Sequence, residues 1–359
     1  MTDDKKISEE TMLDRLWPGT DLLWPLTVRK CELHPLTPGG RQRVDARIVL
    51  ARRDTDETFS FVVEAKSRAT PQYLQSAVIQ ARKATEGSSD LPMIMLPYLS
   101  TDQLKDLESQ SVSGVDMCGN GVVIVPDRLY VSRTGQPNLY PDSRPLSNPY
   151  RGRSAMVARM LLSRPRWESL NALAAAIKDA GVEVSLAQVS KAVRALTEEL
   201  IVLRADGAIF LREPLRLLDR LGAEWRTPEP CARQSVRLPN GYHWPSQLAK
   251  EPAFRWTLTG DTSVDRYTTF AQSGPRRAVV ENIPRAISLL GAKPEPTPNF
   301  ADLELVESDE PGYFFGNEID HGVRWASRLQ TWLELQSGDA RQQEAARDLR
   351  ERILKPVSQ

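Results

Sequence analysis

Apolar and polar residues alternate along two short stretches near the start of the chain, residues 43–50 and 59–66. Both stretches are rich in β-branched residues, and alternation with a period of two is typical of a β-strand with one buried face. The residues between them, 52–57, have the polar composition of a turn. The pattern therefore predicts a β-hairpin.

The predicted hairpin brings acidic residues together. If its turn centres on Asp54-Thr55, the numbers of facing residues add up to about 109, so that Asp45 faces Glu64. Lys66 is two residues beyond Glu64 and shares its face of the sheet. Two carboxylates on one patch repel each other unless a cation lies between them. The hairpin is therefore a candidate functional site.

Helices and further strands are predicted after the hairpin. The segment that begins at Thr70-Pro71 has an apolar stripe of helical period, and residues 91–96 form an apolar run of strand length. Residues 101–109 are predicted as a helix, and residues 114–125 as two strands joined by an Asn-Gly turn. A strand–helix–strand passage needs a crossover, so we expect part of the sheet to be parallel.

An Asp, a variable spacer and Glu-x-Lys at the end of an apolar strand resemble the motif of the PD-(D/E)xK nucleases, which have the restriction-endonuclease-like fold. Asp45, Glu64 and Lys66 match this motif, whereas Val44 stands where the motif has a leading proline. The resemblance covers roughly residues 10–135. It implies an α/β N-terminal domain with a restriction-endonuclease-like mixed sheet.

The same resemblance implies the chemistry of the site. Asp45, Glu64 and the carbonyl of Ala65 would hold Mg²⁺ or Mn²⁺ through oxygen ligands. Lys66 would orient the attacking water or stabilise charge on the phosphoryl group, and the implied activity is hydrolysis of DNA phosphodiester bonds. A structural alternative stays open, in which Glu64 pairs with Lys66, or Asp45 with Arg47, as a buried ion pair.

Basic residues accompany the acidic patch. Arg47, Arg68 and Arg82 are candidates for contacts with DNA phosphates beside the scissile bond. The alternative for these side chains is an ordinary solvated basic face. In the opening helix, Glu9 or Glu10 would either add a further acid to the site or complement the helix dipole.

Residues 136–152 have the composition of a linker, which separates the first domain, residues 1–135, from the rest. Residues 153–222 have the pattern of three helices and an Asp-Gly hairpin, and they resemble an α+β winged helix-turn-helix domain. Such a domain places its third helix in the DNA major groove. The alternative is a winged helix used for dimerisation or protein contact. The implied DNA contacts are Gln188, Ser190, Lys191, Arg194 and Arg204.

Residues 223–359 are predicted to form a small α+β C-terminal domain. Trp256–Gly260 and a terminal pair of helices broken at residues 337–339 resemble the C-terminal part of AbiEi-type transcriptional regulators, the antitoxins of type IV toxin–antitoxin systems. Residues 301–354 hold twelve acidic and six basic residues, so this surface is not expected to contact DNA directly; it would bind a toxin or another protein, or support the winged helix. The second functional hypothesis is therefore a regulator or antitoxin whose nuclease-like domain is a non-catalytic scaffold.

Composition and charge limit the number of domains, the source of any DNA affinity and the compartment of the protein. The chain has 359 residues, which suits two or three domains, and a formal net charge of zero, so DNA affinity has to come from local basic patches. The three cysteines are scattered without zinc-binding spacing, which favours reduced thiols in a cytoplasmic protein. The N-terminus does not read as a signal peptide and no apolar run reaches ~18 residues, so we expect no membrane association. A homodimer is a further expectation.

Overall fold

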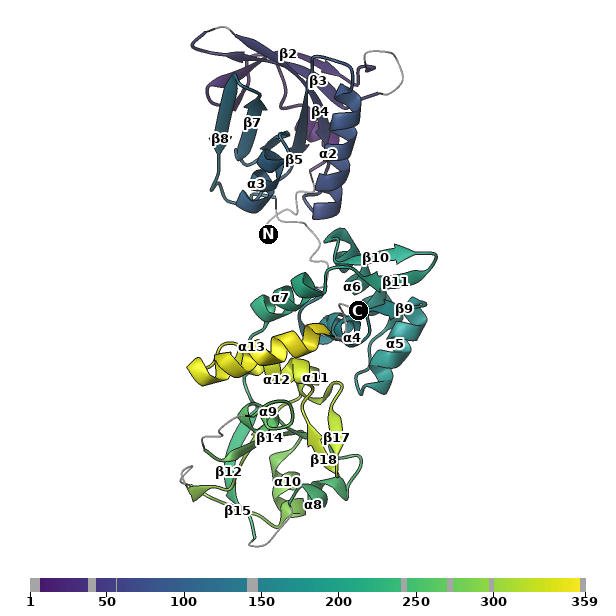
Figure 1. Ribbon diagram of the computed structural model, residues 1–359, viewed down its shortest axis with the longest axis vertical. Coiled ribbons are helices and arrows are strands. Elements are labelled where there is room, and N and C mark those ends of the chain that lie inside the picture. Colours follow the sequence, from purple (N-terminus) through teal and green to yellow (C-terminus); the bar gives the residue numbers. More distant parts are fainter. Residues whose placement is uncertain are drawn as a thin grey trace. The chain divides into compact units, whose positions relative to one another are not determined.

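A computed structural model describes residues 7–37, 43–55, 57–140, 148–239, 244–269, 274–296 and 300–355 (Figure 1). The chain divides into two compact units, Met1–Pro145 and Leu146–Gln359. Each unit has its own large sheet and its own hydrophobic core. Among the helices in these ranges, none is both long enough and apolar enough to cross a lipid bilayer.

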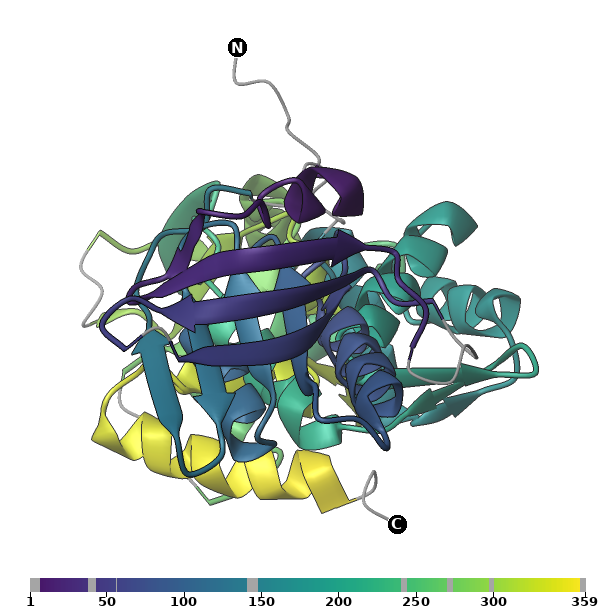
Figure 2. The same ribbon diagram turned by 90° about the horizontal axis from the view of Figure 1, so that it is seen from above.

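The first unit is built on one mixed sheet. Its elements in chain order are α1 (Glu9–Leu13), β1 (Asp21–Leu23), β2 (Leu26–Leu33), β3 (Ala46–Arg52), β4 (Thr58–Ala65), α2 (Pro71–Thr85), β5 (Leu91–Leu96), α3 (Thr101–Ser109), β6 (Ser113–Asp116), β7 (Gly121–Val125) and β8 (Leu129–Arg133). The eight strands pair in chain order, and Figure 2 shows the first of them, in purple, side by side. β4, β5 and β6 are parallel, with α2 and α3 as their crossovers, which confirms the expected parallel part.

Local sequence signals place the two crossover helices. Pro71 occupies the first turn of α2 after the N-cap Thr70, a position where the missing proline N–H costs no hydrogen bond. At α3, Ser100 and Gln103 form a capping box in which each side chain accepts the other residue's backbone N–H. The predicted apolar stripe of α2 is buried, and the helix packs against β4 and β5.

β3 and β4 separate two packed layers. On one face Ile48 and Phe61 belong to the main core of the unit, which α1 also lines. On the opposite face Val62 packs with Ala84 of α2. Glu64 shares the face of Val62 because side chains alternate along a strand. The acidic end of the hairpin therefore lies on the α2 side of the sheet.

The expected restriction-endonuclease-like sheet is wrong. The sheet instead runs through all eight strands in chain order and curls until it is nearly closed. Antiparallel strands outside the predicted core extend it at both ends, where β1 pairs with β2 and β8 pairs with β7. Twist between neighbouring strands accumulates across a sheet, so each added strand curls it further. The local elements agree with the prediction, whereas their arrangement does not.

The second unit contains two sheets. Its elements are a 3₁₀ turn (Gly152–Ser154), α4 (Ala155–Ser163), β9 (Arg166–Trp167), α5 (Leu170–Asp179), α6 (Leu186–Glu198), β10 (Val202–Ala205), β11 (Ala208–Leu211), α7 (Pro214–Glu224), β12 (Ala232–Arg237), α8 (Pro245–Ala249), β13 (Trp256–Leu258), α9 (Asp261–Val264), β14 (Arg276–Val280), α10 (Ile283–Leu290), β15 (Lys293–Pro294), β16 (Leu303–Glu307), α11 (Pro311–Phe314), β17 (Glu318–Asp320), β18 (Val323–Trp325), α12 (Arg328–Leu335) and α13 (Ala340–Leu354). The strand orders are β10-β11-β9 in the small sheet and β15-β12-β16-β14-β13-β18-β17 in the large one.

The expected winged helix followed by a small α+β domain is also wrong. The predicted helices and Asp-Gly hairpin exist, but the described residues do not form a clear winged helix. Helices α4, α5 and α6 share a single core with α7, α12 and α13, and every residue from Ala155 to Leu162 of α4 is buried. The C-terminal region is a mixed α/β structure on a seven-stranded sheet. The reason for the difference is that the terminal helices complete the core around α4.

Candidate metal site on strands β3 and β4

The hairpin has the predicted register. Ala46 pairs with Val63 and Arg47 with Val62, so the numbers of facing residues add up to 109. Asp45 directly precedes β3 and is in register with Glu64 in β4. The Asp45 carboxylate accepts a hydrogen bond from the backbone N–H of Ala65, with Oδ2 2.8 Å from the nitrogen. This bond fixes Asp45 beside the end of β4.

Glu64 is an acid in an unfavourable environment. Its side chain is only 6% exposed, and its Oε2 lies 3.4 Å from Nζ of Lys66, which is itself 17% exposed. The pKa of Glu64 is raised to about 7, mainly by burial and then by the charge of Asp45, while Lys66 opposes the rise. One lysine therefore compensates two adjoining acids incompletely.

The end of β4 is held by neighbouring elements. The backbone N–H of Lys66 donates to the carbonyl of Met95 in β5, at 3.0 Å. The next N–H, of Ser67, donates to Oε1 of Glu9 in α1, at 3.1 Å. Glu9 thus reaches the strand end that carries Glu64 and Lys66, where it binds a backbone N–H.

The donor set fits a hard divalent cation that keeps water or substrate oxygens as further ligands. No group of three His, Cys, Asp or Glu side chains suited to a metal occurs among the described residues, so Asp45 and Glu64 would be the two side-chain ligands. Mg²⁺ is commonly held by one or two carboxylates together with waters and substrate phosphates. A cation here would also remove the repulsion that raises the pKa of Glu64.

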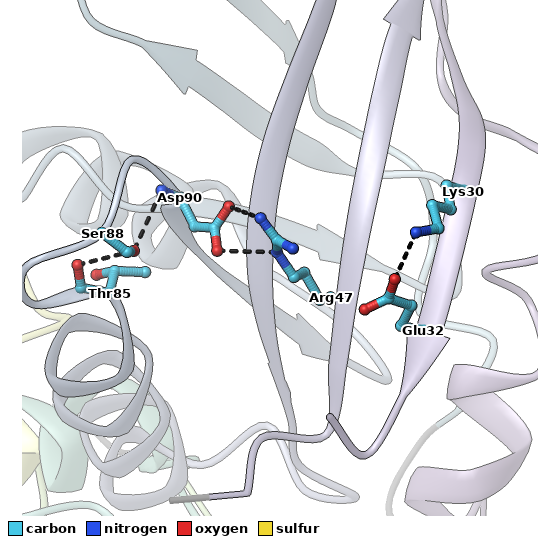
Figure 3. A network of polar contacts seen from close by, with 6 residues as sticks. All are labelled: Lys30, Glu32, Arg47, Thr85, Ser88 and Asp90. Atoms are coloured by element: carbon cyan, nitrogen blue, oxygen red, sulfur yellow. Dashed lines mark hydrogen bonds and ion pairs between the residues drawn. The ribbon is translucent and has the colours of Figure 1, made fainter. Parts of the chain in front are cut away.

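Arg47 is engaged by an acid that the sequence pattern did not reveal. Its Nε and Nη2 each donate to Asp90 at 2.9 Å, and the Asp90 side chain is 1% exposed (Figure 3). Ser88 accepts the backbone N–H of Asp90, and an exposed Lys30–Glu32 pair lies on the neighbouring strand β2. Arg47 therefore pairs with Asp90 rather than with Asp45. In the sequence, the only indication of Asp90 was its place in a stretch of turn composition before β5.

The other predicted phosphate contacts of the first unit lie around α2. Arg68 precedes this helix, and its guanidinium lies 5.8 Å from the ring centre of Tyr73. Arg82, near the end of the helix, donates to the carbonyl of Gln110. Both arginines thus have contacts within the protein.

The predicted DNA contacts of the second unit are spread along α6 and β10. Gln188 belongs to the capping box of Ser185, and Arg194 pairs with Glu198 at 3.1 Å. Lys191 and Arg204 are exposed, and Ser190 is half-buried. Without a clear winged helix, the fold does not assign α6 to a DNA groove.

Comparison of the chain with models of protein families, with curated proteins and with solved structures gives no match.

Proposed function

We propose that the protein hydrolyses phosphodiester bonds in DNA, with a divalent metal ion held at Asp45 and Glu64. The observation that carries this proposal is that Asp45, held by the N–H of Ala65, and Glu64 face each other in matched register, with Nζ of Lys66 3.4 Å from Glu64. The resemblance of the Asp, Glu-x-Lys motif to that of metal-dependent nucleases supports it. The proposal does not depend on the restriction-endonuclease-like fold.

In this proposal the carboxylates of Asp45 and Glu64, with the carbonyl of Ala65, hold Mg²⁺ or Mn²⁺. The ion would polarise the phosphoryl group and lower the pKa of a bound water. The Ala65 N–H keeps the Asp45 carboxylate in place. Lys66, fixed at Glu64, is a compact positive charge that stabilises the charge developing on the phosphoryl oxygens. Glu64 has to lose its proton before it can act as a ligand.

The proposal places the protein in the cytoplasm, with DNA as its partner. Its three cysteines, Cys31, Cys118 and Cys231, are free thiols, as expected in a reducing compartment.

Plasmid cleavage tests the proposal. The wild type is incubated with supercoiled DNA and Mg²⁺ or Mn²⁺, beside Asp45→Asn and Glu64→Gln. Asp54→Asn, which alters a half-exposed acid in the turn of the same hairpin, is the matched control. We expect metal-dependent nicking by the wild type and the control, and none by the two site variants. Equal nicking by all four proteins, or none in any metal, would contradict the proposal.

One observation favours a second candidate. Because Lys66 already pairs with Glu64, the three residues could serve as a structural ion-pair cluster in a regulator or antitoxin that binds a toxin through its acidic C-terminal region. In that case the wild type would not cleave DNA with any metal, and Glu64→Gln would leave partner binding unchanged.

A further inference from the structure

The second unit contains a cavity of about 290 Å³ lined by residues of α4 and by residues at the ends of α12 and α13. Figure 1 shows these helices together in the unit, and both α12 and α4 contact α13. Apolar side chains line part of the cavity, among them Met160, Phe315 and Leu329. Three arginines line the rest, Arg159, Arg328 and Arg352.

Arg159 lies in the middle of α4 and is 4% exposed. Its Nη1 donates to Oε1 of Gln330, at 2.8 Å, and to the carbonyl of Gly312, at 3.2 Å. Within the described part of the chain, no hydrogen bond of Nε or Nη2 and no ion pair of Arg159 is found; Nε is fully buried, and the face of the guanidinium lies 5.7 Å from the ring centre of Trp225. The pKa of Arg159 is lowered to about 10, because burial outweighs the opposite effect of Glu310 and Glu334, so the side chain keeps its charge at neutral pH.

A series of hydrogen bonds between side chains determines which edge of the Arg159 guanidinium has no partner. Gln330 accepts from Arg159 through its oxygen and donates through Nε2 to Glu334, at 2.6 Å. Thr259 donates to the same carboxylate. The amide of Gln330 is thereby oriented, and it holds Nη1 while the Nε–Nη2 edge is left over.

Arg47 shows what this edge does when a partner is present. There, the Nε–Nη2 edge binds both oxygens of Asp90 at 2.9 Å, although the Arg47 side chain is 42% exposed. The same edge of Arg159, in a far more buried position, has no such partner. Buried charged donors are costly when unpaired, so the missing acceptor is the feature that needs explanation.

The other charged residues of the cavity do not provide the acceptor. Nε of Arg328 is also buried without a partner among the described residues, and its Nη1 donates to the carbonyl of Arg352. Among the described residues, Glu318 is the one acid that lines the cavity, and it pairs with Arg266 at 3.4 Å. Arg352 pairs with Asp348, at 3.1 Å, so the surplus of positive charge in the lining comes from Arg159 and Arg328.

We propose that this cavity binds a small organic anion, whose carboxylate or phosphate group is bound by the Nε–Nη2 edge of Arg159. Two coplanar acceptor oxygens match the two parallel N–H groups of that edge. The apolar body of the anion packs against Met160, Phe315 and Leu329. The volume suits a molecule at the lower end of the range bound in typical small-molecule sites.

Calorimetric titration of the full chain tests the proposal with hexanoate and hexyl phosphate as probes, and with hexanol and inorganic phosphate as controls. We expect saturable one-to-one binding of at least one hexyl anion, and no binding of hexanol. Arg159→Lys keeps the positive charge but removes the two parallel N–H groups of the Nε–Nη2 edge. We expect this variant to weaken binding at least tenfold. Arg285→Gln, which removes a half-exposed arginine paired with Glu251 elsewhere in the unit, is expected to leave binding unchanged.

Two further measurements keep the test decisive if the Arg159 variant does not fold. The Nε–H resonance of Arg159 in the wild type is expected to shift on addition of the bound probe, and Arg328→Gln is expected to weaken binding severalfold. No saturable binding by either anion, or binding without a shift of that resonance, overturns the proposal. Inorganic phosphate binding as tightly as hexyl phosphate overturns the assignment of an apolar body.

Discussion

The acidic end of the hairpin and the arginine cavity are sites of opposite sign, and neither is fully compensated by its surroundings. Near Glu64, two carboxyl groups adjoin one lysine. Around Arg159, the cationic edge has no acceptor among the described residues. The Arg47–Asp90 pair shows full compensation within the first unit. The comparison teaches that incomplete pairing, rather than burial alone, separates a candidate ligand site from a structural ion pair.

The largest expected effect is on catalysis. Its absence would show that the acidic end of the hairpin is not a catalytic site. Lys66→Met removes the positive charge beside Glu64 and is expected to lower the rate of DNA cleavage roughly 100-fold. Metal affinity, followed by calorimetry, is expected to remain or to increase because the lysine no longer competes for Glu64. Lys30→Met, which removes an exposed lysine on β2, is the control and should cleave like the wild type. A Lys66→Met protein with full activity would exclude the role proposed for this lysine.

A second effect concerns stability and follows from the raised pKa of Glu64. Folded Glu64 holds its proton up to about pH 7, whereas an unfolded glutamate loses it near its ordinary pKa of 4.5. At Glu64 the folded state therefore binds more protons between these values, and the contribution of Glu64 to the stability of the wild type falls as the pH rises through this window.

Glu64→Gln removes that dependence. Relative to the wild type, the variant is expected to gain up to about 3 kcal/mol in free energy of unfolding between pH 4 and pH 8. Urea denaturation at several pH values without divalent metal measures this difference. A constant difference between the two proteins over this range would show that Glu64 titrates normally.

A third prediction uses the compensated pair as the reference. Arg47→Met leaves the Asp90 carboxylate, with its 1% exposure, buried and unpaired, and is expected to destabilise the protein by about 2 kcal/mol. Asp90→Asn leaves a guanidinium that is already 42% exposed and can be hydrated, so a smaller loss is expected. Urea denaturation compares the two. Equal losses would mean that the buried acid is not the costly partner.

The smallest expected effect is on the pH dependence of metal binding at Asp45 and Glu64. Metal binding requires Glu64 to be deprotonated, so the affinity for Mn²⁺ is expected to rise about tenfold per pH unit below pH 7 and to level off above it. Calorimetric titrations between pH 5.5 and pH 8.5 measure the slope. In Glu64→Gln the residual affinity should lose this slope; an unchanged slope would assign the titration to another group.

Short-range features of this chain are predictable because their causes lie close together in the sequence. The turn composition and the alternation fix the pairing of Ala46 with Val63, which brings Asp45 to Glu64. The caps of α3 and α6 follow from Ser100 with Gln103 and from Ser185 with Gln188.

Pairings between distant segments were not predictable from such signals. In the large sheet β14 runs parallel to β16, and β13 parallel to β18, although no local pattern selects these partners. The strand Leu129–Arg133 has half-buried and exposed residues only, so no fully buried apolar face marks it. Closure of the first sheet and the shared core of the second unit both depend on such contacts.

Arg159 could have been found from the sequence. Apart from Arg159, residues 155–162 are all apolar, a composition that favours a fully buried helix over an amphipathic one. An arginine in the middle of such a helix has to be buried with it, and it then needs acceptors. The sequence signal for a buried arginine was therefore a single charged residue in a helix that has no polar face. No spacing of motif residues was involved.

The common core of α4 with α12 and α13 has a consequence for how this protein can be divided. A fragment ending near residue 225 would keep α4 but lose Trp332, Leu333 and Leu349, which share its core. The bared surface would be apolar and prone to aggregation. The smallest exchangeable module in this half of the chain is therefore the whole of residues 146–359, and recombination within it would separate halves of one folding unit.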